Sequence, residues 1–212
     1  MGDHLRAARR RRHLTLRDLA GRIGLSPSLI SQVETGRARP SVSTLYAIAN
    51  ELDVSLDELL FNDAARAGRS EPPLTVVPMD VASPSAPAAA AHPVQHADDR
   101  AAIRLASGVV WERLTTDSVP GIDFLYVTYE VGGASSAEHE FQRHGGHEWG
   151  FVMSGRLGVT IGFEEHELGP GDSISIDSTV PHRLYNRGTV PVHGIWFVLG
   201  RRSLDVAGLR DE

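Results

Sequence analysis

Three residues in the C-terminal half of the chain have side chains and spacing suited to binding a divalent metal. His144 and Glu148 are four residues apart in a stretch that alternates like a strand, and on a strand such side chains share a face. A second strand that delivers His182 would complete a set of two histidines and one carboxylate. This set suits Fe(II), Mn(II), Ni(II) or Zn(II) with open coordination positions. Gln142 shares the same face and could add its carbonyl oxygen, a poor ligand, whereas His147 points to the other face.

The same residues also allow an interpretation without a metal. His144, Glu148 and His182 could form a hydrogen-bonded cluster inside a pocket for a small molecule. Aromatic residues nearby are mostly core by type, but one or two of them would make that pocket suit a partly apolar ligand. The pocket candidates are Gln142, Tyr126, Phe151, Trp196 and Asn186.

The elements that must carry these residues are short β-strands. From Ile103 to Gly200, alternating runs are separated by Gly, Pro and Asp turns. Many short strands with frequent glycine favour a sandwich or a small barrel. The expected strands include residues 124–131, 148–153, 157–163, 173–176 and 194–199.

Two stretches of this region, 144–155 and 171–186, resemble the two cupin motifs. The resemblance covers about residues 103–200 and implies a double-stranded β-helix, or jelly-roll, barrel. This sequence departs from the pattern, because Gln142 replaces the first histidine of motif one, and the Pro and Gly of motif two are also replaced. A full cupin site has three histidines and a glutamate, so one ligand here is weaker or missing.

The first part of the chain has apolar residues at helical spacing from Leu5 to Phe61. Thr15, Ser26 and Ser41 or Ser43 are N-cap candidates, and Gly24 is the expected end of the second helix. The second and third helices, with the short turn between them, form a helix-turn-helix. The five expected helices are residues 5–12, 16–23, 27–36, 41–52 and 56–61, the last capped by Ser55.

The stretch from Leu14 to Gly36 resembles the DNA-binding domain of the lambda-repressor and Cro family, also called the XRE family. The resemblance covers roughly residues 4–61 and its motif is highly specific. It implies that the third helix lies in the major groove, where Gln32 can pair with adenine. It also implies a structural ion pair between Arg9 and Glu34. The DNA contacts that it implies are the base-facing Ser28, Ser31 and Gln32, the helix terminus at Ser26, and the phosphate-binding Arg17, Arg37 and Arg39.

The charge distribution agrees with a polyanion partner for the N-terminal part alone. Residues 1–40 hold nine arginines and three acidic residues, whereas residues 63–212 hold twelve arginines and twenty acidic residues. The expected organisation is a DNA-binding domain over 1–62, a Pro/Ala-rich linker over 63–100, a cupin domain over 101–204 and a tail over 205–212. Residues 74–78 within the linker could dock as a short strand.

Composition excludes several classes of chemistry. The chain has no cysteine, which excludes disulfides and thiolate sites, and all 21 of its basic residues are arginine, which excludes lysine catalysis. No apolar run approaches 18 residues, and no secretory signal is visible at the N-terminus, so we expect a bacterial cytoplasmic protein without a membrane span.

An XRE-type helix-turn-helix joined to a single cupin resembles a large class of bacterial transcription regulators that respond to small molecules. This resemblance implies a double-stranded DNA operator, a small-molecule effector and a homodimer that pairs through β edges of the cupin. It also implies half-sites about 10 bp apart. The alternative is an enzyme, because the same domain order and metal triad resemble the mononuclear iron epoxidases of phosphonate synthesis. Those enzymes use a lysine that this chain lacks. A third hypothesis is an inert cupin that serves only for dimerisation.

Overall fold

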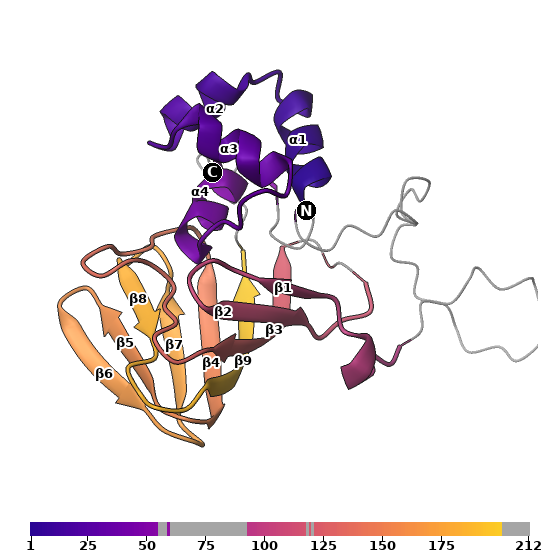
Figure 1. The fold of residues 1–212 in the computed structure, drawn as a ribbon. Helices are drawn as coiled ribbons and strands as arrows, with labels where there is room; N and C mark the ends of the chain where they lie inside the picture. The colour runs from indigo at the N-terminus through magenta and orange to yellow at the C-terminus, as the bar shows by residue number, and fades with distance from the viewer. Residues whose placement is uncertain (55–58, 60–92, 118, 120, 201–212) are drawn as a thin grey trace, which may run out of the picture.

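The structure is a computed structural model, and it describes residues 1–54, 59, 93–117, 119 and 121–200. An α-helical unit precedes a β-sheet unit in the chain, as expected from the sequence. Figure 1 shows the helices gathered beside one end of the strands, with α4 lying nearest to them. None of the helices in this part of the chain is long and apolar enough to cross a membrane.

The helical unit contains α1 (Gly2–Arg11), α2 (Leu16–Arg22), α3 (Pro27–Glu34) and α4 (Val42–Leu52). The N-caps predicted from the sequence are present, because the hydroxyls of Thr15, Ser26 and Ser41 each accept a hydrogen bond from the backbone N–H three residues later. Gly24 has a φ of +69° in the turn between α2 and α3, a conformation that favours glycine. The expected fifth helix falls largely outside the described residues.

A small apolar core fixes the four helices relative to one another. Leu5 of α1, Leu19 of α2 and Ile30 of α3 are fully buried, and they pack with Leu45 and Ile48 of α4. Because one face of α4 belongs to this core, α4 and the helix-turn-helix form one packed body.

The β unit consists of two antiparallel sheets. The larger has the order β1-β2-β3-β9-β4-β7, and the smaller has the order β6-β5-β8. Alternate residues of each central strand are buried, as in a sheet with one face on a core. The strands are β1 (Ala102–Arg104), β2 (Val109–Arg113), β3 (Ile122–Tyr129), β4 (His147–Ser154), β5 (Leu157–Ile161), β6 (Glu164–Leu168), β7 (Ser173–Asp177), β8 (His182–Tyr185) and β9 (Val192–Leu199).

The segment expected to link the two units is described only from residue 93 onward, where η2 (Ala97–Asp99) leads into β1. The strand expected at 74–78 and the tail at 205–212 lie outside the described residues. The two units also meet directly, because the backbone N–H of Ser43 donates to the carbonyl of Ser135 at 3.2 Å. A second backbone hydrogen bond runs from Ala106 to the carbonyl of Pro40 at 3.0 Å.

Candidate functional site

The three candidate ligands come together in the interior of the β unit. Glu148 Oε1 lies 2.8 Å from His144 Nε2 and 3.4 Å from His182 Nε2. The side chains are almost completely buried, and their ligand atoms all lie within 4.8 Å of one another. His182 comes from β8 and Glu148 from β4, as expected, whereas His144 lies in the loop before β4 rather than on the strand. The triad is therefore drawn from three separate segments.

Both imidazoles are oriented by their backbone surroundings. The Nδ1 atom of His144 lies 2.9 Å from the carbonyl oxygen of Gly145, and Nδ1 of His182 lies 2.8 Å from that of Val180. A carbonyl can only accept, so each Nδ1 must carry the proton, which leaves a lone pair on Nε2 in the neutral ring. Metal-binding histidines typically donate their other ring N–H to a carbonyl in this way.

The triad fits a cation better than it fits a closed hydrogen-bond network. Nε2 of His144 and of His182 make no hydrogen bond among the described residues, and neither does the buried Oε1 of Gln142. Two lone pairs aimed at the oxygen of a carboxylate repel it unless positive charge stands between them. Buried polar atoms without partners are costly. The donor set of two nitrogens and a carboxylate therefore suits a divalent transition metal.

Glu148 is held in place by two further side chains. Trp196 donates from Nε1 to Glu148 Oε2 at 3.0 Å, and Ser178 donates from Oγ to Oε1 at 3.0 Å. The indole fits because the residue paired with it across the strands is Gly150, where an added Cβ would come within 2.3 Å of the ring. These bonds fix one orientation of the carboxylate.

A narrow cavity lies against Glu148 and Gln142. It leaves about 10 Å³ of room for the centre of a water molecule, enough for a single water or ion. Burial, reinforced by the negative charge of Glu148, raises the pKa of Tyr129 in the cavity wall, so that phenol stays protonated. The lining residues are Val42, Tyr46, Trp111, Leu125, Val127, Tyr129, Gln142, Glu148, Leu184 and Trp196.

The structure separates the pocket residues proposed from the sequence. Gln142 and Trp196 line the cavity, but Tyr126 and Phe151 lie outside its lining. Tyr126 and Phe151 are on the outer face of the large sheet, because inward and outward positions alternate along β3 and β4. Asn186 is buried, and its amide donates to the carbonyls of Tyr129 and Val190, which is a structural role in the turn after β8.

Ser178, Trp111 and Tyr46 are among the contributors to the site that were not anticipated from the sequence. Ser178 was missed although it lies within motif two, and Trp111 was not among the pocket candidates. Tyr46 lies in the helical unit, and no sequence pattern indicated that α4 would reach the β unit. A period-two alternation applied strictly to β4 and β9 would have placed Trp196 inside and Phe151 outside.

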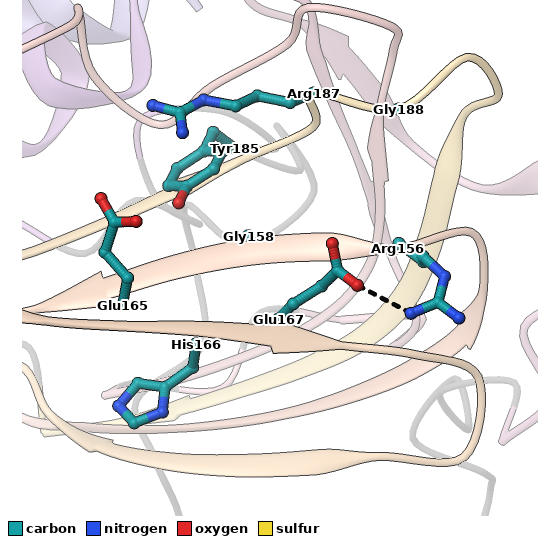
Figure 2. Close-up of a pocket in the computed structure, with 8 residues that line it drawn as sticks. All are labelled: Arg156, Gly158, Glu165, His166, Glu167, Tyr185, Arg187 and Gly188. Atoms are coloured by element: carbon teal, nitrogen blue, oxygen red, sulfur yellow. Dashed lines mark hydrogen bonds and ion pairs between the residues drawn. The ribbon is translucent and has the colours of Figure 1, made fainter.

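A larger cavity of about 420 Å³ lies on the outer face of the small sheet, away from the triad. Figure 2 shows Glu165 and Glu167 on the side of the strand that faces Tyr185, while His166 points to the opposite side. Arg156 is paired with Glu167 at 2.7 Å, and the guanidinium of Arg187 covers the Tyr185 ring. The basic groups of this hollow already have partners, so it is not a candidate ligand site.

The helix-turn-helix presents its proposed contacts to solvent. Ser28 and Gln32 are exposed one turn apart on α3, and Ser31 is half-buried beside them. Arg17, Arg37 and Arg39 are exposed. The hydroxyl of Ser26 already accepts a hydrogen bond from the Leu29 N–H as the cap of α3.

The ion pair that the resemblance implied, between Arg9 and Glu34, is buried beneath the proposed DNA-binding surface. Arg9 donates from Nε and Nη2 to the two carboxylate oxygens of Glu34, at 2.6 and 2.9 Å, in a buried bidentate pair. The hydrogen bonds to Glu34 raise the pKa of Arg9. The pair ties α1 to the end of α3, as a structural role requires.

Comparison with known proteins matches both units. The helix-turn-helix family model matches residues 5–59, and the cupin domain model matches residues 125–198. The HTH-type transcriptional regulator PuuR of Escherichia coli is 27% identical over 187 residues, which cover 87% of this chain and 86% of PuuR. The uncharacterized HTH-type transcriptional regulator y4dJ of Sinorhizobium fredii is 38% identical over 60 residues, 28% of this chain and 78% of that protein.

A solved structure shows the same fold over nearly the whole chain. The HTH_3 family transcriptional regulator from Vibrio cholerae superposes with a TM-score of 0.60 at 20% identity and covers 93% of each chain. The named relatives are transcriptional regulators, which supports regulation of transcription rather than catalysis. The chain therefore belongs to the XRE-type helix-turn-helix transcriptional regulators, and it joins that DNA-binding domain to a C-terminal cupin domain.

Proposed function

We propose that this regulator senses a divalent metal, alone or with a small-molecule effector, in its cupin domain. The metal would be held by His144, Glu148 and His182, and Gln142, which lines the same cavity as Glu148, would serve as a weak fourth ligand. The observation that carries the proposal is the pair of Nε2 atoms, buried, without hydrogen bonds, and facing one carboxylate oxygen. Fe(II), Mn(II), Ni(II) and Zn(II) all accept this donor set, and each would offer open positions to an effector.

At the DNA end, we propose the contacts that the fold presents to solvent. Gln32 and Ser28 would read base edges from α3, with Ser31 beside them. Arg17, Arg37 and Arg39 would bind phosphates, together with the amides at the start of α3 near Ser26. The partner is a double-stranded operator in the bacterial cytoplasm.

Two copies of the chain would pair through the outer face of the large sheet. Alternation along β4 should leave polar residues on that face, yet Trp149, Phe151 and Met153 are 40–49% exposed there. Phe124 of β3 and Leu199 of β9 extend the same face. If each of these five side chains has a total surface of about 200 Å², their exposed fractions add up to roughly 400 Å² of apolar surface. Two such faces supply about half of a standard dimer interface of ~1,600 Å², with the rim adding the rest.

Elemental analysis of protein purified without chelator tests the sensing proposal. We expect close to one metal per chain in the wild type, and loss of that metal in His144→Ala. The matched control is His147→Ala, which removes an exposed histidine on the opposite face three residues away. Binding of the protein to its own promoter DNA is then compared with and without the metal. Absence of metal from the wild type, even after soaking with Fe(II), Ni(II) and Zn(II), would contradict the proposal.

A further inference from the structure

The wall of the cupin cavity is completed by the DNA-binding unit. Tyr46, on α4, stacks on the imidazole of His144 with ring centroids 4.1 Å apart and planes 7° from parallel. The same ring also makes a T-shaped contact with Trp111 of β2, with ring centroids 6.0 Å apart. Val42, one turn earlier on α4, also lines the cavity. Tyr46 is 4% exposed, so its ring lies in a slot formed largely by the β unit.

This arrangement leaves no space for an organic effector. The cavity beside Glu148 admits one water-sized object, whereas pockets for small molecules are typically about 300–1,000 Å³. The other walls are residues of β2, β3, β4, β8 and β9, which hydrogen bonds hold in the two sheets, and Gln142, whose backbone pairs with that of His182. The contacts of the α4 wall with the β unit include backbone hydrogen bonds at Pro40 and Ser43 and the stacking of the Tyr46 ring. Withdrawal of α4 is therefore the opening that leaves the strand pairing of both sheets intact.

We infer that Tyr46 occupies the place of the effector, and that the effector is a small molecule with a single planar, aromatic-sized ring. Such a ring would lie on the His144 imidazole in the slot between it and Trp111, close to Glu148 and Gln142. It cannot enter while Tyr46 is there. Effector binding and docking of α4 on the cupin are then mutually exclusive, and each weakens the other by the same factor. The inference rests on the proposed sensing role and names the ligand class and the residue that reports its binding.

Displacement of Tyr46 would affect DNA binding because α4 packs on both the helical unit and the cupin cavity. Leu45, Ile48 and Leu52 are buried in one apolar cluster with residues of α3, and Val42 and Tyr46 of the same cluster also line the cupin cavity. A ligand that expels Tyr46 therefore releases the helix-turn-helix as one body, with no rearrangement inside it.

Phenol is a suitable probe, because Tyr46→Ala deletes a phenol ring from the slot. In the full-length Tyr46→Ala chain, we expect saturable phenol binding by equilibrium dialysis, at least about tenfold tighter than in the wild type. Cyclohexanol, of similar size but not planar, should bind markedly less. Tyr126→Ala, which removes a tyrosine from the outer face of β3, is the control and should behave like the wild type. Equal phenol binding to wild type and Tyr46→Ala, or none to either, would overturn the inference, as would equal binding of the two probes.

Mutual exclusion is tested by the double variant Ser43→Cys, Ser135→Cys in the otherwise cysteine-free chain. The extent of its disulfide in a glutathione buffer measures how often α4 is docked. Phenol, at concentrations well above those that saturate Tyr46→Ala, should lower this extent, and cyclohexanol should not. An unchanged extent would refute the exclusion. Neither test uses metal or DNA, so both remain decisive if elemental analysis finds no metal, and a negative result in them leaves the metal proposal intact.

Discussion

Replacement of Trp196 by Phe isolates the contribution of one hydrogen bond to the proposed metal site. The indole Nε1 donates to Glu148 Oε2 at 3.0 Å, and both groups are buried. Phe keeps an aromatic ring over Gly150 but has no donor. A hydrogen bond to a charged group contributes about 1.5–3 kcal/mol. Loss of an outer-shell partner typically weakens metal binding by about 10–100-fold, which corresponds to about 1.4–2.8 kcal/mol. The two independent ranges overlap, so we expect a loss of affinity within that span.

The assay is a competition titration against a chromophoric chelator, with Zn(II) as the probe metal. Trp149→Phe is the matched control, because Trp149 lies on the outer face of the same sheet and is 40% exposed. Ser178→Ala, which removes the other donor to Glu148, should give a loss of similar size. Equal Zn(II) affinity in Trp196→Phe and Trp149→Phe would refute the reasoning that the indole orients the carboxylate for a metal.

Five other changes test separate parts of the molecule. Gln32→Ala should weaken operator binding by roughly 1–3 kcal/mol at one base position, whereas Arg37→Ala should weaken binding to all sequences and reduce the salt slope by about one unit. Glu34→Gln leaves a buried guanidinium without its carboxylate and should destabilise the chain by about 3–5 kcal/mol in urea unfolding. Phe151→Asp should shift the sedimentation coefficient from dimer to monomer. The pKa of Asp18 is lowered by hydrogen bonds from Thr15, so its stabilising effect is complete above its ordinary pKa and is lost as the pH falls through the lowered pKa. In Asp18→Asn, the free energy of unfolding should therefore fall less steeply as the pH is lowered.

Control variants or contrary results test the reasoning behind four of these changes. A Gln32→Ala loss that is equal on random DNA would remove Gln32 from base recognition. Glu51→Gln breaks the more exposed pair with Arg22 and should cost under about 1 kcal/mol. If Glu51→Gln lowers the free energy of unfolding as much as Glu34→Gln does, burial of the Arg9–Glu34 pair is not the cause of the larger loss expected in Glu34→Gln. Phe163→Asp changes a fully exposed phenylalanine in the β5–β6 turn and should leave the dimer intact. An acid limb that survives in Asp18→Asn must come from other carboxylates.

Much of the fold could be predicted because local signals and global structure agree. The hydroxyl caps, the glycine turn and the apolar spacing of the helices act over a few residues, and the sequence displays them directly. His182 and Glu148 were identifiable because metal chemistry restricts the residue types that can serve. Tyr46 was not, because its contact with His144 depends on how two units pack, and helical spacing alone places a tyrosine on a face without saying what that face meets.

The two-faced helix α4 also affects how the chain should unfold. The Tyr46 and Val42 side chains are 4% and 1% exposed, and the cavity of the β unit is the surface that they line. Cutting the chain between the units would expose them to water and remove a wall from the barrel, so each fragment would be less stable than the same residues in the whole protein. The boundary between sensor and DNA reader therefore falls inside a cooperative unit, although the linker in the sequence marks it as a division between domains.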